Sequence, residues 1–329
     1  MAYSQGGLIA AADYNTFVGV SPSSTANTVN TVWAVGNGQY GYGQTAIPQV
    51  SAGNTITAAQ WATFINNLNS LRTHQTGAGS GIAAPTAGTT INYLNTLSTQ
   101  INSGYSGALL FNSQGTTTAG TATNTGFSNA NTSSALTFSV SRTATFASAD
   151  QARYFFNAGG QLNFVCGTAT NNDGTTRSGD LVTLVNTNFI SYPAFRAASG
   201  GGRTGTGGTA NTNSTTIGYY QLTTSNQTLC QVTSATSGYT GDYILLQVLS
   251  NGAQGANADK GTVITFTLTI YSGARTAIPA PPAAGPGGVP PTNNTTVNDS
   301  VNITVPNRVD IVYPETTNLS ASWGTVTIA

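Results

Sequence analysis

The stretch "ALTFSVSRTATF" at residues 135–146 decides the fold class of this 329-residue chain. Its apolar and hydroxyl-bearing side chains alternate, with Leu136, Phe138 and Val140 on one side and Thr137, Ser139 and Ser141 on the other. A period of two residues is typical of a strand with one face in a hydrophobic core and the other in water. The stretch therefore predicts a half-buried β-strand.

Further runs of this kind follow through the C-terminal part of the chain. They read "QLNFVCGTAT" (161–170), "DLVTLVNTNFI" (180–190), "IGYYQLTT" (217–224), "QTLCQVTS" (227–234), "YILLQVLS" (243–250) and "TVITFTLTIYS" (262–272). The sequences "NDG", "TSNQ" and "NGAQG" supply turns. Short strands at this spacing, mostly without helices between them, predict a mainly β fold: an antiparallel β-sandwich over residues 109–329.

Three segments depart from the strand pattern inside this region. Residues 148–160 predict one helix, with Ser148 as its N-cap and Gly159 as its terminator. The Gly-rich run at 199–209 predicts a surface loop, because it lacks the lysine and the following helix of a phosphate-binding loop. The Pro/Gly-rich run at 277–292 predicts a long surface loop between strands of one sandwich. A linker to a small C-terminal module is the alternative interpretation.

Residues 1–108 have helical periodicity instead and predict a small helical and loop region for docking or oligomerisation. The clearest helix has Thr57 as its N-cap, with Gln60 completing a capping box, and it ends at Gly77. A second helix is predicted over residues 91–104, and a shorter one over 9–19.

Aromatic and apolar residues of this region form a candidate interface. Two belong to a Gly-rich loop and four to one stripe of the clearest helix: Tyr40, Tyr42, Trp61, Phe64, Leu68 and Leu71. The stripe is suited either to the second helix of the same chain or to sister subunits around a three-fold axis. The aromatic residues fit sugars, a neighbouring subunit, or the interior of their own domain.

Charged side chains are scarce, and this narrows the range of partners. They make up 5% of the chain, against about a quarter in an average protein, and nine basic residues balance nine acidic ones. Such a chain offers no basic surface to nucleic acid or to anionic lipid. It also has no apolar run near the ~18 residues of a membrane span, and its first residues lack the pattern of a secretory signal. An uncharged surface disfavours free monomers, so we expect the protein to work in an assembly.

No group of residues forms a catalytic, cofactor or metal motif. The single histidine, His74, falls in the last turn of the clearest helix, and no nucleophile motif accompanies it. The carboxylates Asp173, Asp180, Asp242 and Glu315 are interpreted as turn or strand-edge residues rather than as a glycosidase pair. Calcium at 171–180 is disfavoured, because the EF-hand register is missing. Cys166 and Cys230 lie in strand-like runs and are interpreted as buried free thiols.

Three stretches together resemble structural proteins of tailed bacteriophages, especially those that infect cyanobacteria. The first, over residues 40–77, contains "YGYGQ", "AAQW" and "HQTG". The other two are "FASADQARYFFNAGGQLNF" (146–164) and "RVDIVYPETTNL" (308–319). The resemblance covers most of the chain. It implies a virion structural protein and no catalytic residue.

We therefore hypothesise that the protein is a structural subunit of a phage virion, and that it is a tail fibre, baseplate or adhesin component. Its partners would be further copies of itself, with a trimer favoured, other virion proteins and, as an added partner, a host-surface glycan. The alternatives are a capsid decoration protein and a carbohydrate-binding adhesion module. We expect no enzyme activity and no cofactor, and we expect the protein in the virion after assembly in the host cytoplasm.

Overall fold

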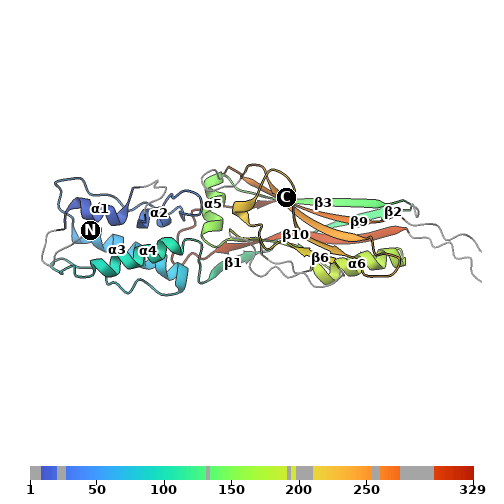
Figure 1. The fold of residues 1–329 in the computed structure, drawn as a ribbon, viewed down its shortest axis with the longest axis horizontal. Helices are drawn as coiled ribbons and strands as arrows, with labels where there is room; N and C mark the ends of the chain where they lie inside the picture. The colour runs from blue at the N-terminus through green and yellow to red at the C-terminus, as the bar shows by residue number, and fades with distance from the viewer. Residues whose placement is uncertain are drawn as a thin grey trace, which may run out of the picture.

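A computed structural model describes residues 9–20, 27–130, 134–190, 194–197, 210–253, 260–274 and 300–329. It is an elongated molecule with a helical half at one end and a β half at the other (Figure 1). The loops expected at 199–209 and 277–292 lie outside the described residues. None of the helices in the described ranges combines the length and apolar character of a membrane span.

The helical half contains the helices α1 (Ala11–Val18), α2 (Val29–Trp33), α3 (Ala58–Thr76) and α4 (Leu94–Ser106). Thr57 caps α3 with the predicted capping box to Gln60, and Gly77 ends it in the left-handed conformation. The two long helices pack on each other within the chain, where Gly104 of α4 fits beside Leu71 of α3. The short helix α2 is not among the elements that the sequence pattern predicts.

The core of the helical half is aromatic. The indole of Trp61 lies 5.3 Å from the rings of both Tyr14 and Phe64, measured between centroids, and Phe17 stacks on Phe64 at 6.5 Å. All four side chains are buried. The apolar stripe of α3 is therefore covered by α1 of the same chain, which brings the two helices together by burial of aromatic surface.

The β half consists of two antiparallel sheets, as the alternating pattern predicts. The first sheet is built around the long strand β10 (Val301–Pro314). Four strands pair with it: β1 (Gln114–Thr118), β2 (Thr123–Asn129), β4 (Gln161–Cys166) and β5 (Thr170–Asn171). The strands β1 and β2 follow one another along one edge of β10, and β4 and β5 along the other.

The second sheet has the order β11-β3-β9-β8-β7-β6 within the described residues. Its strands are β3 (Leu136–Thr145), β6 (Ala210–Asn213), β7 (Gln227–Thr233), β8 (Tyr243–Ser250), β9 (Val263–Ser272) and β11 (Thr327–Ile328). Phe164 of the first sheet meets Phe266 of the second, and Phe127 meets Phe138 in the same way. The inner faces of the two sheets thus form one apolar core, and the mainly β, sandwich-like fold is confirmed.

Two of the expected strands have a different structure. The run 180–190 belongs to the helix α6 (Thr176–Asn188), and the run 217–224 contains only the 3-10 turn Tyr219–Gln221. The pattern of α6 is helical, because Leu181, Leu184 and Val185 are buried at a spacing of three and four residues. Arg177 holds α6 to β9, donating from Nε to Ser272 Oγ at 2.7 Å. Asp180 therefore lies in a helix, not at the start of a strand.

The remaining helix, α5 (Ala149–Asn157), agrees with the prediction and begins at the N-cap Ser148. It stands at the end of the β half that faces the helical half (Figure 1). Its buried side chains Phe155 and Phe156 contact Phe146, which continues the sandwich core up to the boundary with the helical half. The expected boundary at residue 108 falls between α4 and β1, but the segment after β10 also contacts the helical half.

Candidate functional site

A network of buried polar side chains joins the two halves of the described chain. A loop over residues 34–44 leaves α2 and turns back on it, since Tyr42 N donates to Val32 O at 2.8 Å. Gly43 in this loop has a φ of +69°, and a Cβ there would lie 2.4 Å from Cδ2 of Tyr154 in α5. Only glycine combines this backbone conformation with so close an approach of α5.

The side chain of Gln44 connects this loop to the segment that follows β10. Its Oε1 accepts a hydrogen bond from Ser320 N at 2.7 Å, and its Nε2 donates to Ser320 O at 2.9 Å. The side-chain amide of Gln44 thus forms with Ser320, 276 residues away, the pair of hydrogen bonds that a neighbouring strand would form. Ser322 Oγ also donates to Tyr42 O, which fixes the same segment at a second point.

His74 and Glu315 form the centre of the junction. His74 Nδ1 lies 2.9 Å from Glu315 Oε1, and both side chains are almost without exposed surface. Glu315 Oε2 accepts hydrogen bonds from the backbone N–H groups of Thr317 at 2.6 Å and Asn318 at 3.0 Å. The chain's single histidine and single glutamate therefore meet across 241 positions of sequence.

The environment of this pair favours a neutral imidazole beside an ionised carboxylate. Burial lowers the pKa of His74, against the hydrogen bond and charge of Glu315, which act to raise it. Burial alone would raise the pKa of Glu315, but hydrogen bonds from Asn318, His74 and Thr317 hold it below its usual value. His74 Nε2 is buried without a hydrogen-bond partner in the described residues, so a proton there would have no acceptor. Nδ1 accordingly carries the proton and donates it to Glu315.

Two further side chains complete the junction from the helical side. Gln75 Nε2 donates to Gly104 O of α4 at 2.8 Å and to the hydroxyl of Tyr42 at 3.2 Å. The ring of Tyr42 meets His74 edge-on at 5.1 Å. The C-terminal end of α3 is therefore tied at the same place to α4, to the loop and to the segment after β10.

From the β half, α5 and the 3-10 turn reach the same loop. Asn157 Nδ2 donates to Gly38 O and Gly41 O, both at 3.1 Å. The hydroxyl of Tyr220 lies 2.6 Å from Gly38 O and 2.7 Å from Asn157 Oδ1. These buried hydrogen bonds, together with those of Gln44, Gln75, His74 and Glu315, are called the junction network below.

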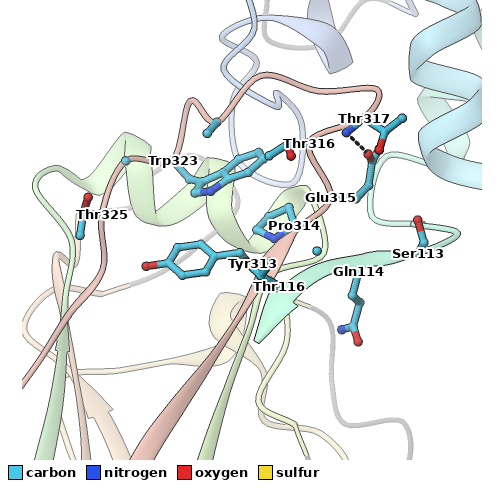
Figure 2. Close-up of a pocket in the computed structure, with 13 residues that line it drawn as sticks. Ser113, Gln114, Thr116, Tyr313, Pro314, Glu315, Thr316, Thr317, Trp323 and Thr325 are labelled. Atoms are coloured by element: carbon cyan, nitrogen blue, oxygen red, sulfur yellow. Dashed lines mark hydrogen bonds between the residues drawn. The ribbon is translucent and has the colours of Figure 1, made fainter. Parts of the chain in front are cut away.

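A hollow of about 460 Å³ opens beside the junction network, between β1 and the segment after β10. Figure 2 shows Tyr313 and Trp323 on one side of it and Ser113 and Gln114 on the other. Its lining carries hydroxyl, amide and aromatic groups, and the one carboxylate, Glu315, is already hydrogen-bonded. The hollow is therefore suited to a neutral polar group rather than to an ion.

A second hollow, of about 510 Å³, lies at the far end of the helical half. Its walls are mostly apolar and come from α1, the start of α3 and the loop before α4, with Ile56, Trp61 and Ile91 among them. The indole N–H of Trp61 has no acceptor in the described residues, but it is buried beyond the reach of solvent. A ligand in this hollow would therefore not reach it without movement of the helices.

The structure places the candidate interface residues inside the chain. Tyr40 stacks on Tyr105 at 4.3 Å and keeps part of its surface. The other five have at most 2% of their surface exposed: Tyr42, Trp61, Phe64, Leu68 and Leu71. These five side chains therefore pack within their own chain, where α1, α4 and the junction cover them.

The other candidate residues lie in separate local structures. Asp173 accepts from Thr175 N just before α6, Asp180 from Ser234 Oγ, and Asp242 from Ser272 Oγ. Within the described ranges, no three histidine, cysteine or carboxylate side chains gather where a metal ion would fit. Both cysteines are free and buried, and burial raises the pKa of the Cys166 thiol to about 12.

The sequence contains one signal for the junction, in the apolar stripe of α3. Continuing the stripe of α3 by three residues from Leu71 reaches His74, so the pattern already predicts a buried histidine. A buried imidazole needs a hydrogen-bond partner, but no pattern in the sequence indicates that Glu315 supplies it. Comparisons with protein-family models, curated proteins and solved structures found no match to this chain.

Proposed function

We propose that this chain is a structural subunit of a tailed-phage virion, in the tail as a fibre, baseplate or adhesin component. Assembly rather than catalysis is its proposed role. The helical half would attach to the particle or to other copies, and the β half would project outward. No cofactor and no nucleic acid enter this proposal.

One observation carries the proposal: the stretches that resemble phage structural proteins meet at the junction network. Residues 40–77 supply Gln44, His74 and Gln75, the second stretch supplies α5 with Asn157, and the third supplies Glu315. The motif residues thus join two differently built halves rather than surround a substrate. A rigid connection of this kind is what an elongated subunit needs in order to hold its far end at a fixed place.

The nearest alternative is a capsid decoration protein, which needs the same neutral β half but a different place on the particle. Immunogold electron microscopy of virions, with antibody raised against the recombinant β half, separates the two. Gold at the tail tip or along fibres supports the tail proposal, and gold spread over the head supports decoration. Serum adsorbed with the recombinant protein is the control. Unlabelled virions, with the protein present in the lysate and its epitope accessible, would overturn the virion assignment.

A carbohydrate-binding role is the second candidate, and a pair of rings on the second sheet favours it. Tyr243 of β8 and Tyr271 of β9 stack at 4.7 Å on the face that points away from the core. Partly exposed aromatic rings among threonine hydroxyls suit the apolar face of a neutral sugar. Glycan-array binding that is lost in Tyr271→Ala but kept in Thr265→Ala, farther along β9, supports this role. Binding by neither the parent chain nor the control would exclude it.

A further inference from the structure

The second sheet has an open edge along β3. On one side β3 pairs with β9 over its whole length, in regular register from Leu136 to Thr145. On the other side β11 pairs only with Ala144 and Thr145. Most of β3 therefore has no neighbouring strand on this side within the described ranges.

Two hydrogen bonds fix which backbone groups face the open side. Phe146 N donates to Thr262 O, toward the β9 side, whereas Thr143 N donates to Ala329 O, away from it. Successive residues of a strand point their N–H and C=O groups to opposite sides. Thr137, Ser139 and Ser141 therefore direct their backbone groups outward, and their N–H groups have no acceptor among the residues that the structure describes.

Among the residues that the structure describes, this edge carries one of the devices that protect edge strands in monomers, the inward-pointing charge of Arg142, and lacks the others named below. Such strands usually carry lysine, proline or a bulge. The chain has no charged side chain between His74 and Arg142, and Arg142 itself turns inward, donating to Asn307 Oδ1 at 2.7 Å. β3 contains no proline and its register with β9 has no bulge.

The first sheet also ends at this flank of the sandwich. Phe127 of β2 lies 5.4 Å from Phe138 of β3, measured between ring centroids. β2 pairs only with β10 within the described residues, and most of its side chains are exposed. Two uncharged strand edges, one from each sheet, therefore lie side by side.

We propose that the β3 edge pairs with a second copy of this chain, as one antiparallel β3–β3 ladder that continues the sheet across both subunits. A strand can pair with its own copy in this way around a two-fold axis, since each contact is then made twice. The outward N–H and C=O groups supply the hydrogen bonds, as in recognition by strand addition. Because the edge is uncharged, the two copies do not repel each other. The inference goes beyond the proposed function, because pairing of two chains does not depend on whether the protein belongs to a virion.

The test is sedimentation of the purified full chain over a range of concentrations, with three variants. Ser139→Pro removes an outward N–H and leaves the ladder to β9 intact, and Ser141→Lys places a charge at the edge. Gln247→Lys is the matched control, because Gln247 lies in the same row of the same face but two strands farther in. We expect each edge variant to weaken association by roughly tenfold to a hundredfold and the control to change it less than about twofold.

Amide hydrogen exchange of the parent chain gives a second readout that needs no variant. The amides of Thr137, Ser139 and Ser141 should exchange rapidly in dilute solution and become protected where the chain associates. A chain that stays monomeric at all concentrations would overturn the inference. So would association that both edge variants leave unchanged, or association without protection of these three amides. The virion assignment would survive each of these outcomes, because its test is the gold label on particles.

Discussion

The helical half and the junction network both bury large side chains, but they use opposite chemistry. In the helical half, Tyr14, Phe17, Trp61 and Phe64 pack as an almost purely apolar cluster. At the junction, the buried groups are the polar side chains of Gln44, Gln75, His74, Asn157 and Glu315.

This contrast indicates which part supplies most of the stability and which part fixes the orientation of the two halves. Apolar contact is non-directional, so an aromatic cluster favours compactness and tolerates small shifts of one helix on another. A buried hydrogen bond is favourable only with its partner in place, and a missing partner leaves a costly unsatisfied group. We therefore expect the aromatic cluster to dominate the free energy of unfolding, and the junction network to fix how the two halves are joined.

The largest effect is expected in the aromatic cluster. Phe64→Ala removes a ring with no exposed surface and leaves a cavity, so the free energy of unfolding should fall by about 3–5 kcal/mol. Denaturant unfolding followed by tryptophan fluorescence measures this fall. Asn66→Ala, at an exposed position of the same helix, is the control and should change it by less than about 0.5 kcal/mol. Equal effects of the two changes would show that the aromatic cluster does not dominate the free energy of unfolding.

A double-mutant cycle tests the junction network. His74→Gln and Glu315→Gln should show a coupling of about 1.5–3 kcal/mol, because each removes a hydrogen bond to a buried charged or imidazole group. In contrast, Phe64→Ala and Glu315→Gln should be additive to within about 0.5 kcal/mol. Additivity of the His74 and Glu315 changes would mean that the pair does not act as a unit.

The glycine at the junction gives a smaller and more local comparison. Gly43→Ala and Gly53→Ala both place a side chain at positive φ, but only the Cβ at Gly43 meets another element, Tyr154 of α5. The shared backbone strain cancels, so Gly43→Ala should cost about 1–3 kcal/mol more than Gly53→Ala. Chemical denaturation of the two variants measures the difference. Equal costs would show that α5 moves away freely.

The smallest effect is expected in the pH dependence of stability that the His74–Glu315 pair causes. The lowered pKa of His74 means that the unfolded chain binds its proton first, so stability should fall as the pH drops below 6.5. The lowered pKa of Glu315 adds a further loss as the pH drops below 4.5. Each group contributes at most about 1.4 kcal/mol per pH unit. Because the chain has one histidine, His74→Gln should remove the decline between pH 6.5 and 4.5; a decline that persists would have another origin.

Elements whose pattern is local could be predicted from the sequence, as α3, β8 and β9 show. The capping box at Thr57 and the strict alternation in β8 and β9 each specify an element from neighbouring residues alone. α6 was missed because "DLVTLV" has apolar residues that fit a short strand as well as a helix. The N-cap Thr175, whose side chain accepts from Ser178 N, was the signal that separates the two.

The junction network was harder to predict because its partners are distant in sequence. Gln44 and Ser320 lie 276 positions apart, and His74 and Glu315 lie 241 apart. No periodicity within one segment reports such a pairing, since register and packing of the whole fold decide it. The burial of His74 was predictable from the stripe of α3, but the identity of its partner was not.

The path of β10 has a mechanical consequence. This strand of 14 residues is hydrogen-bonded along both edges, and it leads directly into Glu315 and the segment that Gln44 holds. A pull that separates the two halves would therefore load β10 along its own length. The hydrogen bonds between β10 and its neighbouring strands would then be loaded simultaneously in shear, rather than opened one at a time. The molecule therefore has the arrangement of a tether that is loaded along its long axis.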